Sequence, residues 1–387
     1  MNRRIVAMAR HTARGLFVAG LLTLAACASA PAQSAPTGKE SAPAAKAPEG
    51  PTRAAPTRPA HLWPFTKIQG IEWVKLDDVA AHYRLKTAWS KPGVEMTLAD
   101  ARGVRLRFEA NQRDFHLDGV RVFLGRSALL HRASLWVTRL DVIKTIAPLL
   151  RPEDHLAFLP AAPPKVIVID AGHGGNDPGK QNLKLKLDEK DMTLDVVLRL
   201  KKLLELRGFK VKLTRDKDER LANEQRADLD RRAAVSKEAK ADLFLSIHFN
   251  AVEPRDAARV TGTETYVLTP QFQWSSTDNG GDSLTNTAFP GNRQDVANVV
   301  AGYQLHWAML AGLKTSDRGF KRGRLRVLIM PECPAALLEA AYLSNDKEAA
   351  RVGTPEFRQE IAESIAEGVQ SYAALIAALR PPPPPDK

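Results

Sequence analysis

The feature that most constrains the fold is an alternation of apolar runs and helical periods that begins near residue 166. Residues 166–169 are continuously apolar, as in a strand that is buried on both faces. Prolines at positions 160, 163 and 164 precede this run and indicate a domain boundary. Alternation of this kind predicts a mainly parallel sheet with helices on both faces. We therefore expect residues 164–380 to form an α/β domain, with three αβα layers around a mainly parallel, mixed sheet.

Periodicity places the elements of this domain. The expected strands are residues 166–169, 210–214, 243–247, 262–268, 326–329 and 336–340, and the expected helices are residues 192–206, 228–237, 296–313 and 357–379. Residues 269–293 are rich in Ser, Thr, Asn and Gly, a composition that argues against a stable helix. We expect a flexible loop on the substrate side there, and autoinhibition by this segment stays open. Residues 381–387 are a Pro-rich tail.

The first 27 residues have the pattern of an export signal. Basic residues precede an apolar stretch, residues 16–26, that is too short to span a bilayer as a permanent helix. The stretch ends in Leu-Ala-Ala-Cys at Cys27, which resembles the lipobox of bacterial lipoproteins, and ordinary cleavage after Ala30 is the alternative. We therefore expect a membrane anchor through lipidated Cys27 and a periplasmic location. Ala28 favours the outer membrane, by resemblance to the usual sorting rule.

A linker and a small domain follow. Residues 28–60 are mostly Ala, Pro, Ser and Thr, so they cannot bury enough apolar surface to fold, and we expect disorder. Residues 61–155 predict a small α+β accessory domain, with strands at 71–76, 86–89, 95–98, 104–109, 119–124 and 133–137 and helices at 77–83 and 140–149. Similar phrases begin at Trp73 and Trp136. This echo weakly resembles the stalk domain of copper amine oxidases, and an unrelated accessory domain is the alternative.

Charge and cysteine content limit the partners. A formal net charge of +12 draws the protein to polyanions or anionic surfaces. We expect no nucleic-acid partner, because the chain has no recognition-helix pattern, no aromatic RNA-binding signature and no dense Lys/Arg block. Apart from Cys27 the only cysteine is Cys333, so no intramolecular disulfide is expected after lipidation. Cys333 is expected to be a small buried side chain, and a fourth metal ligand is the alternative.

Three side chains suited to binding a metal stand where predicted strands end or a helix begins. His173 lies in a Gly-rich loop after the first strand, Glu189 begins the next helix, and His248 ends the strand at 243–247. Each has an ordinary alternative: helix capping for His173, a dipole-favoured carboxylate for Glu189, and a structural role for His248. Because ligands bind at the carboxyl ends of such strands, the three can converge at one edge. They match the His₂Glu set of catalytic zinc, which leaves a fourth position for water.

Glu339 is an acidic residue inside the apolar run at 336–340. Burying a carboxylate is costly unless it is paired or functional. Near a metal-bound water, burial would raise the pKa of this carboxylate towards the working pH, which suits a general base. Ser246 is not expected to be a nucleophile, because it lacks the setting of a nucleophile elbow.

Four phrases occur in a fixed order: Gly-His-Gly-Gly at His173, Glu-Lys-Asp at Glu189, Ser-Ile-His at His248 and Leu-Glu-Ala-Ala-Tyr-Leu-Ser-Asn at Glu339. Over about residues 165–375 they resemble the zinc-dependent type 3 family of N-acetylmuramoyl-L-alanine amidases. The resemblance implies that the first three residues bind Zn²⁺ and that Glu339 is catalytic. It also implies hydrolysis of the amide between N-acetylmuramic acid and L-alanine in peptidoglycan, for wall remodelling or daughter-cell separation. Leu-Glu-Ala in place of the family's Val-Glu-Thr/Ile is a conservative departure.

The remaining expectations concern substrate and partners. Asn250 and Arg215 are the expected substrate contacts, while support of the sheet edge or a surface salt bridge is the alternative for Arg215, Arg226 and Arg232. Peptidoglycan is the expected partner, and an activator protein is a further candidate. Two other functions stay open: an inactive wall-binding lipoprotein, and a zinc hydrolase of the same fold that acts on a different amide.

Overall fold

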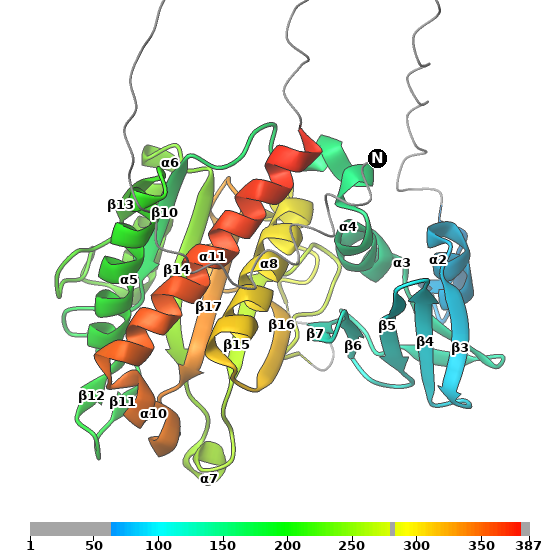
Figure 1. Cartoon of the computed structure of the whole chain (residues 1–387), viewed down its shortest axis with the longest axis horizontal. Coiled ribbons are helices and arrows are strands. Elements are labelled where there is room, and N and C mark those ends of the chain that lie inside the picture. Colours follow the sequence, from blue (N-terminus) through cyan, green and yellow to red (C-terminus); the bar gives the residue numbers. More distant parts are fainter. Residues whose placement is uncertain (1–62, 279–282, 381–387) are drawn as a thin grey trace, which may run out of the picture.

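The computed structural model describes residues 63–278 and 283–380, which form a large α/β domain and a smaller β-rich domain beside it (Figure 1). The predicted signal peptide, Cys27, the linker and the Pro-rich tail lie outside these residues and stay predictions. Within the described ranges, no helix combines the length and the apolar character that a membrane span needs.

The α/β domain is built on six strands in the order β13-β10-β14-β17-β15-β16. Their bounds are Val166–Ala171 for β10, Lys210–Leu213 for β13, Leu243–Asn250 for β14, Thr263–Leu268 for β15, Asp317–Gly323 for β16 and Ala335–Tyr342 for β17. The first four strands in that order are parallel, whereas β15 is antiparallel to β17 and β16 is parallel to β15. The prediction of a mainly parallel, mixed sheet is confirmed.

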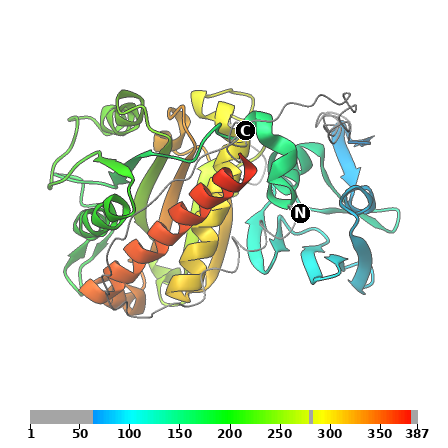
Figure 2. The ribbon, with the colours of Figure 1, turned by 45° about the horizontal axis from the view of Figure 1, so that its top comes forward.

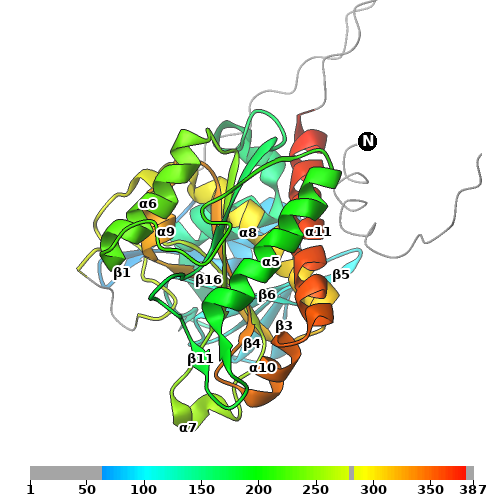
Figure 3. The same ribbon diagram turned by 90° about the vertical axis from the view of Figure 1, so that its left-hand side faces the viewer.

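Helices cover both faces of this sheet (Figure 3). They are α5 (Glu189–Leu206), α6 (Gln225–Glu238), α8 (Asp295–Leu313), α9 (Arg326–Ile329) and α11 (Pro355–Leu379). On one face α11 lies between α5 and α8 and packs against both (Figure 2), and α6 and α9 pack together on the other. Ile167 and Ile169 of β10 belong to the core under α5, and Val168 belongs to a second core with Val235 of α6. The three-layer αβα prediction is confirmed.

Local sequence sets the helix starts. Pro355 occupies the first turn of α11, and the Thr354 side chain accepts a hydrogen bond from the Phe357 N–H, so the helix begins there. The Asn345 side chain likewise caps the short helix α10 (Asp346–Val352). The other short elements are β11 (Gln181–Asn182), β12 (Leu187–Asp188) and α7 (Pro254–Ala257). Helix α10 lies with them at the end of the sheet where β14 finishes (Figure 1).

The smaller domain is a β-meander beside a four-stranded sheet, as the α+β prediction expected. The meander contains β3 (Lys86–Lys91), β4 (Glu95–Asp100), β5 (Gly103–Glu109), β6 (Asp114–Leu117) and β7 (Val120–Phe123). The second sheet contains β1 (Thr66–Ile68), β2 (Ile71–Lys75), β8 (Leu129–His131) and β9 (Ser134–Thr138), and the helices are α2 (Leu76–Tyr83), α3 (Arg139–Asp141) and α4 (Ala147–Leu150). The two repeated phrases form β2 and β9, which pair with Val74 opposite Val137.

The two domains share one sheet. Strand β7 pairs with β16 through Val122 and Phe320, so the meander extends the sheet of the α/β domain to eleven strands. Arg322 of β16 is fully buried at this junction and donates hydrogen bonds to the Thr145 hydroxyl at 2.5 Å and the Lys144 carbonyl at 2.9 Å. The smaller domain is therefore continuous with the strands that carry the site described below.

Two sequence predictions in this region are wrong. Residues 326–329 form helix α9 instead of a strand, because a short apolar run does not distinguish a strand from a buried helical turn. The segment that follows β15 does not lie on the substrate side. Strand β15 pairs antiparallel with β17 from Glu264, opposite Glu339, towards Leu268. The segment after Leu268 therefore begins at the opposite end of the sheet from His248.

Candidate active site

Three elements deliver the predicted metal ligands to one edge of the sheet. His173 follows the end of β10, Glu189 is the first residue of α5, and His248 lies near the end of β14. Strands β10 and β14 are parallel neighbours, with Ala171 beside Ile247, so the two histidines emerge side by side. Glu189 reaches them because the β11–β12 hairpin brings the chain back to the end of this loop, where the Glu189 N–H donates a hydrogen bond to the Lys180 carbonyl at 2.9 Å.

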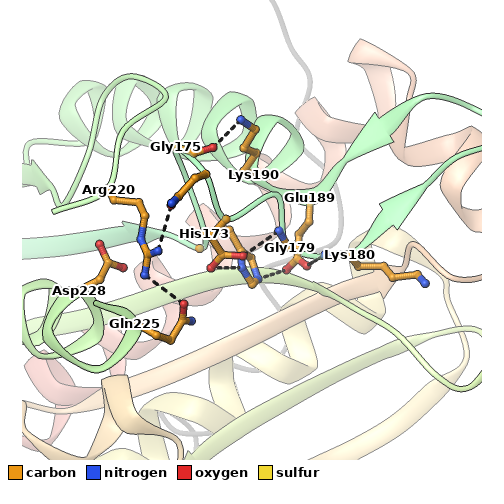
Figure 4. Close-up of polar contacts among 12 residues, drawn as sticks. His173, Gly175, Gly179, Lys180, Glu189, Lys190, Arg220, Gln225 and Asp228 are labelled. Carbon is orange, nitrogen blue, oxygen red and sulfur yellow. Dashed lines mark hydrogen bonds and ion pairs between the residues drawn. The ribbon is translucent and has the colours of Figure 1, made fainter. Parts of the chain in front are cut away.

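The Glu189 carboxylate lies between the two imidazoles. Its Oε1 is 3.2 Å from His173 Nε2 and 3.0 Å from His248 Nδ1, and it accepts a hydrogen bond from the Phe249 N–H at 3.0 Å. Its Oε2 accepts one from the Lys180 N–H at 2.8 Å (Figure 4). Burial would raise the pKa of Glu189, but the hydrogen bonds from His173 and His248 outweigh burial and hold this pKa far below its usual value. The carboxylate is therefore ionised and fixed.

Two glycines make this close approach feasible. A Cβ on Gly172 would lie 2.3 Å from the His248 ring, and a Cβ on Gly179 would lie 2.6 Å from the His173 ring and 2.7 Å from Glu189 Oε2. Gly179 also has φ of +66°, which side chains rarely adopt. His173 itself has φ of +62°, an uncommon backbone conformation that the surrounding loop maintains.

Asp177 orients His173 from behind. Its Oδ2 is 3.0 Å from His173 Nδ1, and its Oδ1 accepts a hydrogen bond from the Gly179 N–H at 3.1 Å. A carboxylate that binds the outer nitrogen of a histidine fixes the ring and its tautomer, so that Nε2 faces the ligand site. The sequence analysis missed this role, although the spacing of four residues between His173 and Asp177 was visible.

Two arginines brace the loop from inside. Arg215 is 2% exposed and donates hydrogen bonds to the carbonyls of Ala171 at 2.9 Å, Gly172 at 2.9 Å and Lys190 at 2.7 Å. This position beneath the loop contradicts the predicted substrate contact of Arg215 and matches the alternative of sheet-edge support.

Arg232 is 1% exposed and is no surface residue either. It lies 3.0 Å from Asp170 and 2.6 Å from Asp228, and it donates a hydrogen bond to the carbonyl of His173 at 2.6 Å. The Ser246 hydroxyl donates a hydrogen bond to Asp170 at 2.6 Å, so Ser246 supports this network. This buried ion network fixes the end of β10, from which the His173 loop starts.

Glu339 stands beside the ligand set in the strand pairing. It is opposite His248 on β14 and opposite Glu264 on β15, so the three side chains form a row across adjacent strands. Glu339 Oε2 is enclosed and has no hydrogen-bond partner among the described residues. Burial, reinforced by the charges of Glu189 and Glu264, raises the pKa of Glu339 well above its usual value, and Lys321 opposes the shift. The two carboxylates therefore differ: the surroundings favour the ionised form of Glu189 and raise the proton affinity of Glu339.

Glu264 completes the row and was not anticipated from the sequence. It is 1% exposed and pairs with Lys321 of β16, and it accepts hydrogen bonds from Asn250 and from the Tyr342 hydroxyl. The predicted substrate residue Asn250 is thus bound to Glu264 at the margin of the site. Its substrate contact stays a prediction.

The residues present fit a divalent transition metal. His173, Glu189 and His248 each offer a donor atom, all within 4.8 Å of one another, and form the only such group of His, Cys, Asp or Glu within residues 63–278 and 283–380. Two imidazoles with one carboxylate are the donors of catalytic zinc sites, whereas Mg²⁺ and Ca²⁺ prefer oxygen donors. Cys333 lies in the second core, and burial raises its pKa to about 12, so it is a core residue as predicted.

Known proteins share this part of the chain. Residues 167–371 match the family model Amidase_3, described as N-acetylmuramoyl-L-alanine amidase. The N-acetylmuramoyl-L-alanine amidase AmiC of Escherichia coli O6:H1 is 31% identical over 232 residues, covering 54% of this chain and 53% of that relative. The germination-specific N-acetylmuramoyl-L-alanine amidase of Bacillus subtilis strain 168 is 31% identical over 217 residues, covering 54% of this chain and 79% of that relative.

A solved structure, the catalytic domain of the N-acetylmuramoyl-L-alanine amidase CwlV from Bacillus (Paenibacillus) polymyxa var. colistinus, has 30% sequence identity and a TM-score of 0.43, covering 54% of this chain and 97% of that one. The chain spans about half the length of the AmiC relatives that it matches. The family model spans more than half of the 387 residues and includes His173, Glu189, His248 and Glu339. The chain therefore belongs to the N-acetylmuramoyl-L-alanine amidase family.

Proposed function

We propose that the protein is a zinc-dependent hydrolase of peptidoglycan that cleaves the amide between the lactyl group of N-acetylmuramic acid and L-alanine. The observation that carries this proposal is the row formed by His248, Glu339 and Glu264, with the His173–Glu189 pair beside it. It juxtaposes a metal-ligand set and an enclosed carboxylate of raised pKa, the two components that metal-assisted amide hydrolysis needs.

The division of labour follows from the charges. His173, Glu189 and His248 would hold Zn²⁺, which when bound supplies Lewis-acid polarisation of the amide carbonyl and acidifies water. Glu339 would take the proton of the attacking water at Oε2, which has no other partner among the described residues. Because its pKa is raised, Glu339 can retain this proton and pass it to the departing alanine nitrogen. No covalent intermediate is required.

The location is part of the proposal. Lipidated Cys27 would anchor the protein in the outer membrane with its hydrolase domain in the periplasm, where the net positive charge favours the anionic wall. Peptidoglycan would be the partner, an activator protein remains a further candidate, and wall remodelling or daughter-cell separation would be the role. Incorporation of labelled fatty acid that Cys27→Ser abolishes would support the anchor, and unchanged labelling would exclude it.

The direct test is digestion of purified wall sacculi by the zinc-loaded protein, with the soluble products analysed by mass. We expect stem peptides with a free N-terminal alanine and glycan that keeps its lactyl carboxylates. Cleavage within the peptide or within the glycan would contradict the proposal. Glu339→Gln protein at equal concentration is the control for contaminating hydrolases.

Metal content tests the ligand assignment separately. Glu189→Ala is expected to lose its zinc, because it removes a ligand and the carboxylate that orders both histidines. Glu332→Ala is the matched control, since this glutamate pairs with Lys237 at the surface and lies outside the site. Full zinc content of folded Glu189→Ala would overturn the assignment.

A further inference from the structure

A cavity lies between the smaller domain and the segment that follows β15. Its volume is about 360 Å³, within the range of small-ligand sites. The residues that matter here are Lys67, Arg126 and Arg139 of the smaller domain and Phe272, Gln273 and Trp274 of the segment. Because β15 runs away from Glu339, this cavity is separate from the candidate active site.

Gln273 lines this cavity and holds its segment against the smaller domain. Its side chain is only 3% exposed, and its Nε2 donates a hydrogen bond to Asp141 Oδ1 at 3.0 Å. That bond fixes the orientation of the amide, so Oε1 must be the acceptor. Oε1 is buried and accepts no hydrogen bond from the residues that the structure describes. Because this atom has almost no exposed surface, a ligand in the cavity does not reach it, and Gln273 serves to hold the neighbouring Phe272 and Trp274 beside the smaller domain.

Phe272 brings an exposed ring on a strained backbone. It is 58% exposed and has φ of +67°, a conformation that bulky residues rarely adopt. Its N–H donates a hydrogen bond to the Thr285 carbonyl at 2.8 Å, which helps to maintain this conformation. Strain of this kind gathers at ligand clamps, where the surrounding structure enforces it. The result is an aromatic face presented to solvent at the cavity.

The charges of the lining favour an anion. It contains three basic residues and one acid, Glu72, whose Oε2 lies 2.8 Å from Arg139. The Arg126 guanidinium lies 3.7 Å from the ring centroid of Trp274, so it is held at the cavity by a cation–π contact. A guanidinium positioned in this way can bind a carboxylate through two parallel hydrogen bonds.

We propose that this cavity binds a segment of N-acetylated glycan whose lactyl groups carry free carboxylates. The carboxylate would bind Arg126, and the apolar face of a sugar ring would pack on Phe272. The choice of ligand rests on the proposed function, because such glycan is what remains after stem peptides are released. A phospholipid headgroup would supply the negative charge but no flat ring for Phe272.

The consequence is a protein that stays on glycan it has already processed. The cavity lies at the end of the sheet away from Glu339, so occupation of the cavity leaves the active site available for the next stem peptide. One glycan strand carries several uncut amides. A protein held on that strand by the cavity therefore meets these amides at a raised effective concentration, as any two-site binder does.

The test is titration of the full chain with soluble glycan freed of stem peptides, followed by calorimetry. Arg126→Gln and Phe272→Gly are each expected to weaken binding about tenfold, as for anchor residues at an interface. Arg231→Gln is the control for the loss of one charge, because Arg231 pairs with Glu238 at the surface of α6, and it should bind as the wild type does. Wild-type affinity in both cavity variants would overturn the inference.

Phe272→Gly also distinguishes a ligand site from a structural role. Glycine adopts positive φ without strain, so the thermal midpoint of this variant should equal or exceed that of the wild type while glycan binding falls. A fall in the midpoint with unchanged binding would overturn the inference. The inference would also be overturned if the cavity variants lost affinity for vesicles containing phosphatidylglycerol by the same factor of about ten, because the cavity would then bind a lipid headgroup equally well.

The titration is independent of hydrolysis, because the probe contains no amide to a stem peptide. Both cavity variants should still release stem peptides from sacculi. If the wild-type protein released none but its glycan affinity still depended on Arg126 and Phe272, the proposed function would fail and the glycan site would stand.

Discussion

The two sides of the candidate active site treat buried charge in opposite ways. On the β10–β14 side the buried carboxylates are matched: Glu189 accepts hydrogen bonds on both oxygens, and Asp170 is paired with Arg232. On the β17–β15 side, Glu339 lies beside Glu264, and its Oε2 has no partner within the part of the chain that the structure describes. The first arrangement fixes geometry, and the second holds a carboxylate at high free energy.

This difference teaches which groups position and which react. A ligand set works best when its donors are immobilised before the metal arrives, and the hydrogen bonds of Glu189 and Asp177 achieve this. A group that exchanges protons needs a free lone pair and a raised proton affinity. Glu339 Oε2 has no partner among the described residues, and burial raises the pKa of Glu339. Perturbation of the first side should therefore alter metal binding and stability, whereas perturbation of the second should alter turnover.

The largest expected effect tests the second side. Glu339→Gln should lower the rate of stem-peptide release by a factor of about 10² to 10⁴, the usual contribution of general acid–base catalysis. Zinc content should stay at the wild-type value, because Glu339 is outside the ligand group. The measurements are release of stem peptides from sacculi and metal analysis of the same sample. Loss of zinc in this variant would break the proposed division between the two sides.

The next effect tests the buried ion network of the first side. Arg232→Ala leaves Asp170 and Asp228 without their shared cation, so the free energy of unfolding should fall by about 3 to 5 kcal/mol. Arg326→Ala is the matched control, since Arg326 pairs with Asp230 at the surface and such pairs contribute about 1 kcal/mol or less. Urea unfolding of both variants gives the comparison. Equal losses of unfolding free energy would show that Arg232 contributes no more to stability than a surface arginine.

A smaller effect is expected for the residue that orients His173. Asp177→Asn replaces one of two acceptor oxygens by a donor, so it cannot accept both from the Gly179 N–H and from the Nδ1–H of the His173 tautomer that leaves Nε2 free for a metal. Zinc affinity should fall about 10- to 100-fold, as is usual when the partner of a ligating histidine is lost. Competition with a chromophoric chelator measures this affinity, and Asp230→Asn serves as the control. Unchanged affinity would mean that the loop alone orients His173.

Most of the first side could be predicted from sequence, and much of the second could not. Parallel strands that end in His173 and His248 produce a regular apolar pattern, and their carboxyl ends meet by topology. The bracing arginines were misjudged, because a sequence does not reveal whether the side chain of Arg215 or Arg232 points inward. Their burial depends on carboxylates and carbonyls that lie 25 to 62 residues away along the chain.

The role of Glu264 was missed because its partner, Lys321, lies on strand β16, which could not be predicted from local sequence. The sequence of β16, Asp-Arg-Gly-Phe-Lys-Arg-Gly, has no strand-like pattern of apolar residues. The strand forms because its cations have partners on both sides: Lys321 pairs with Glu264, and Arg322 donates hydrogen bonds to the smaller domain. These pairings are long-range, so neither the strand nor the continuous sheet between the domains was accessible from local propensity.

The smallest expected effect concerns pH and separates the two sides most directly. Glu339 has a raised pKa in the folded state, so its contribution to stability is complete below its unfolded pKa, near 4.5, and is lost as pH rises through the folded pKa. For Asp170, burial alone would raise the pKa, but Arg232 and the Ser246 and Thr214 hydroxyls outweigh burial and lower it. Its contribution is therefore present above the usual aspartate pKa and is lost as pH falls.

Comparison of metal-free wild-type and Glu339→Gln protein isolates the glutamate. A single proton limits the slope to about 1.4 kcal/mol per pH unit, and the free-energy difference between the two proteins should grow in favour of the variant as pH rises above about 4.5. Urea unfolding at several pH values measures this difference, and the contribution of Asp170 cancels because both proteins retain it. A difference that does not change with pH would mean that the pKa of Glu339 is the same in the folded and unfolded protein, and the contrast between the two sides would then lie in geometry alone.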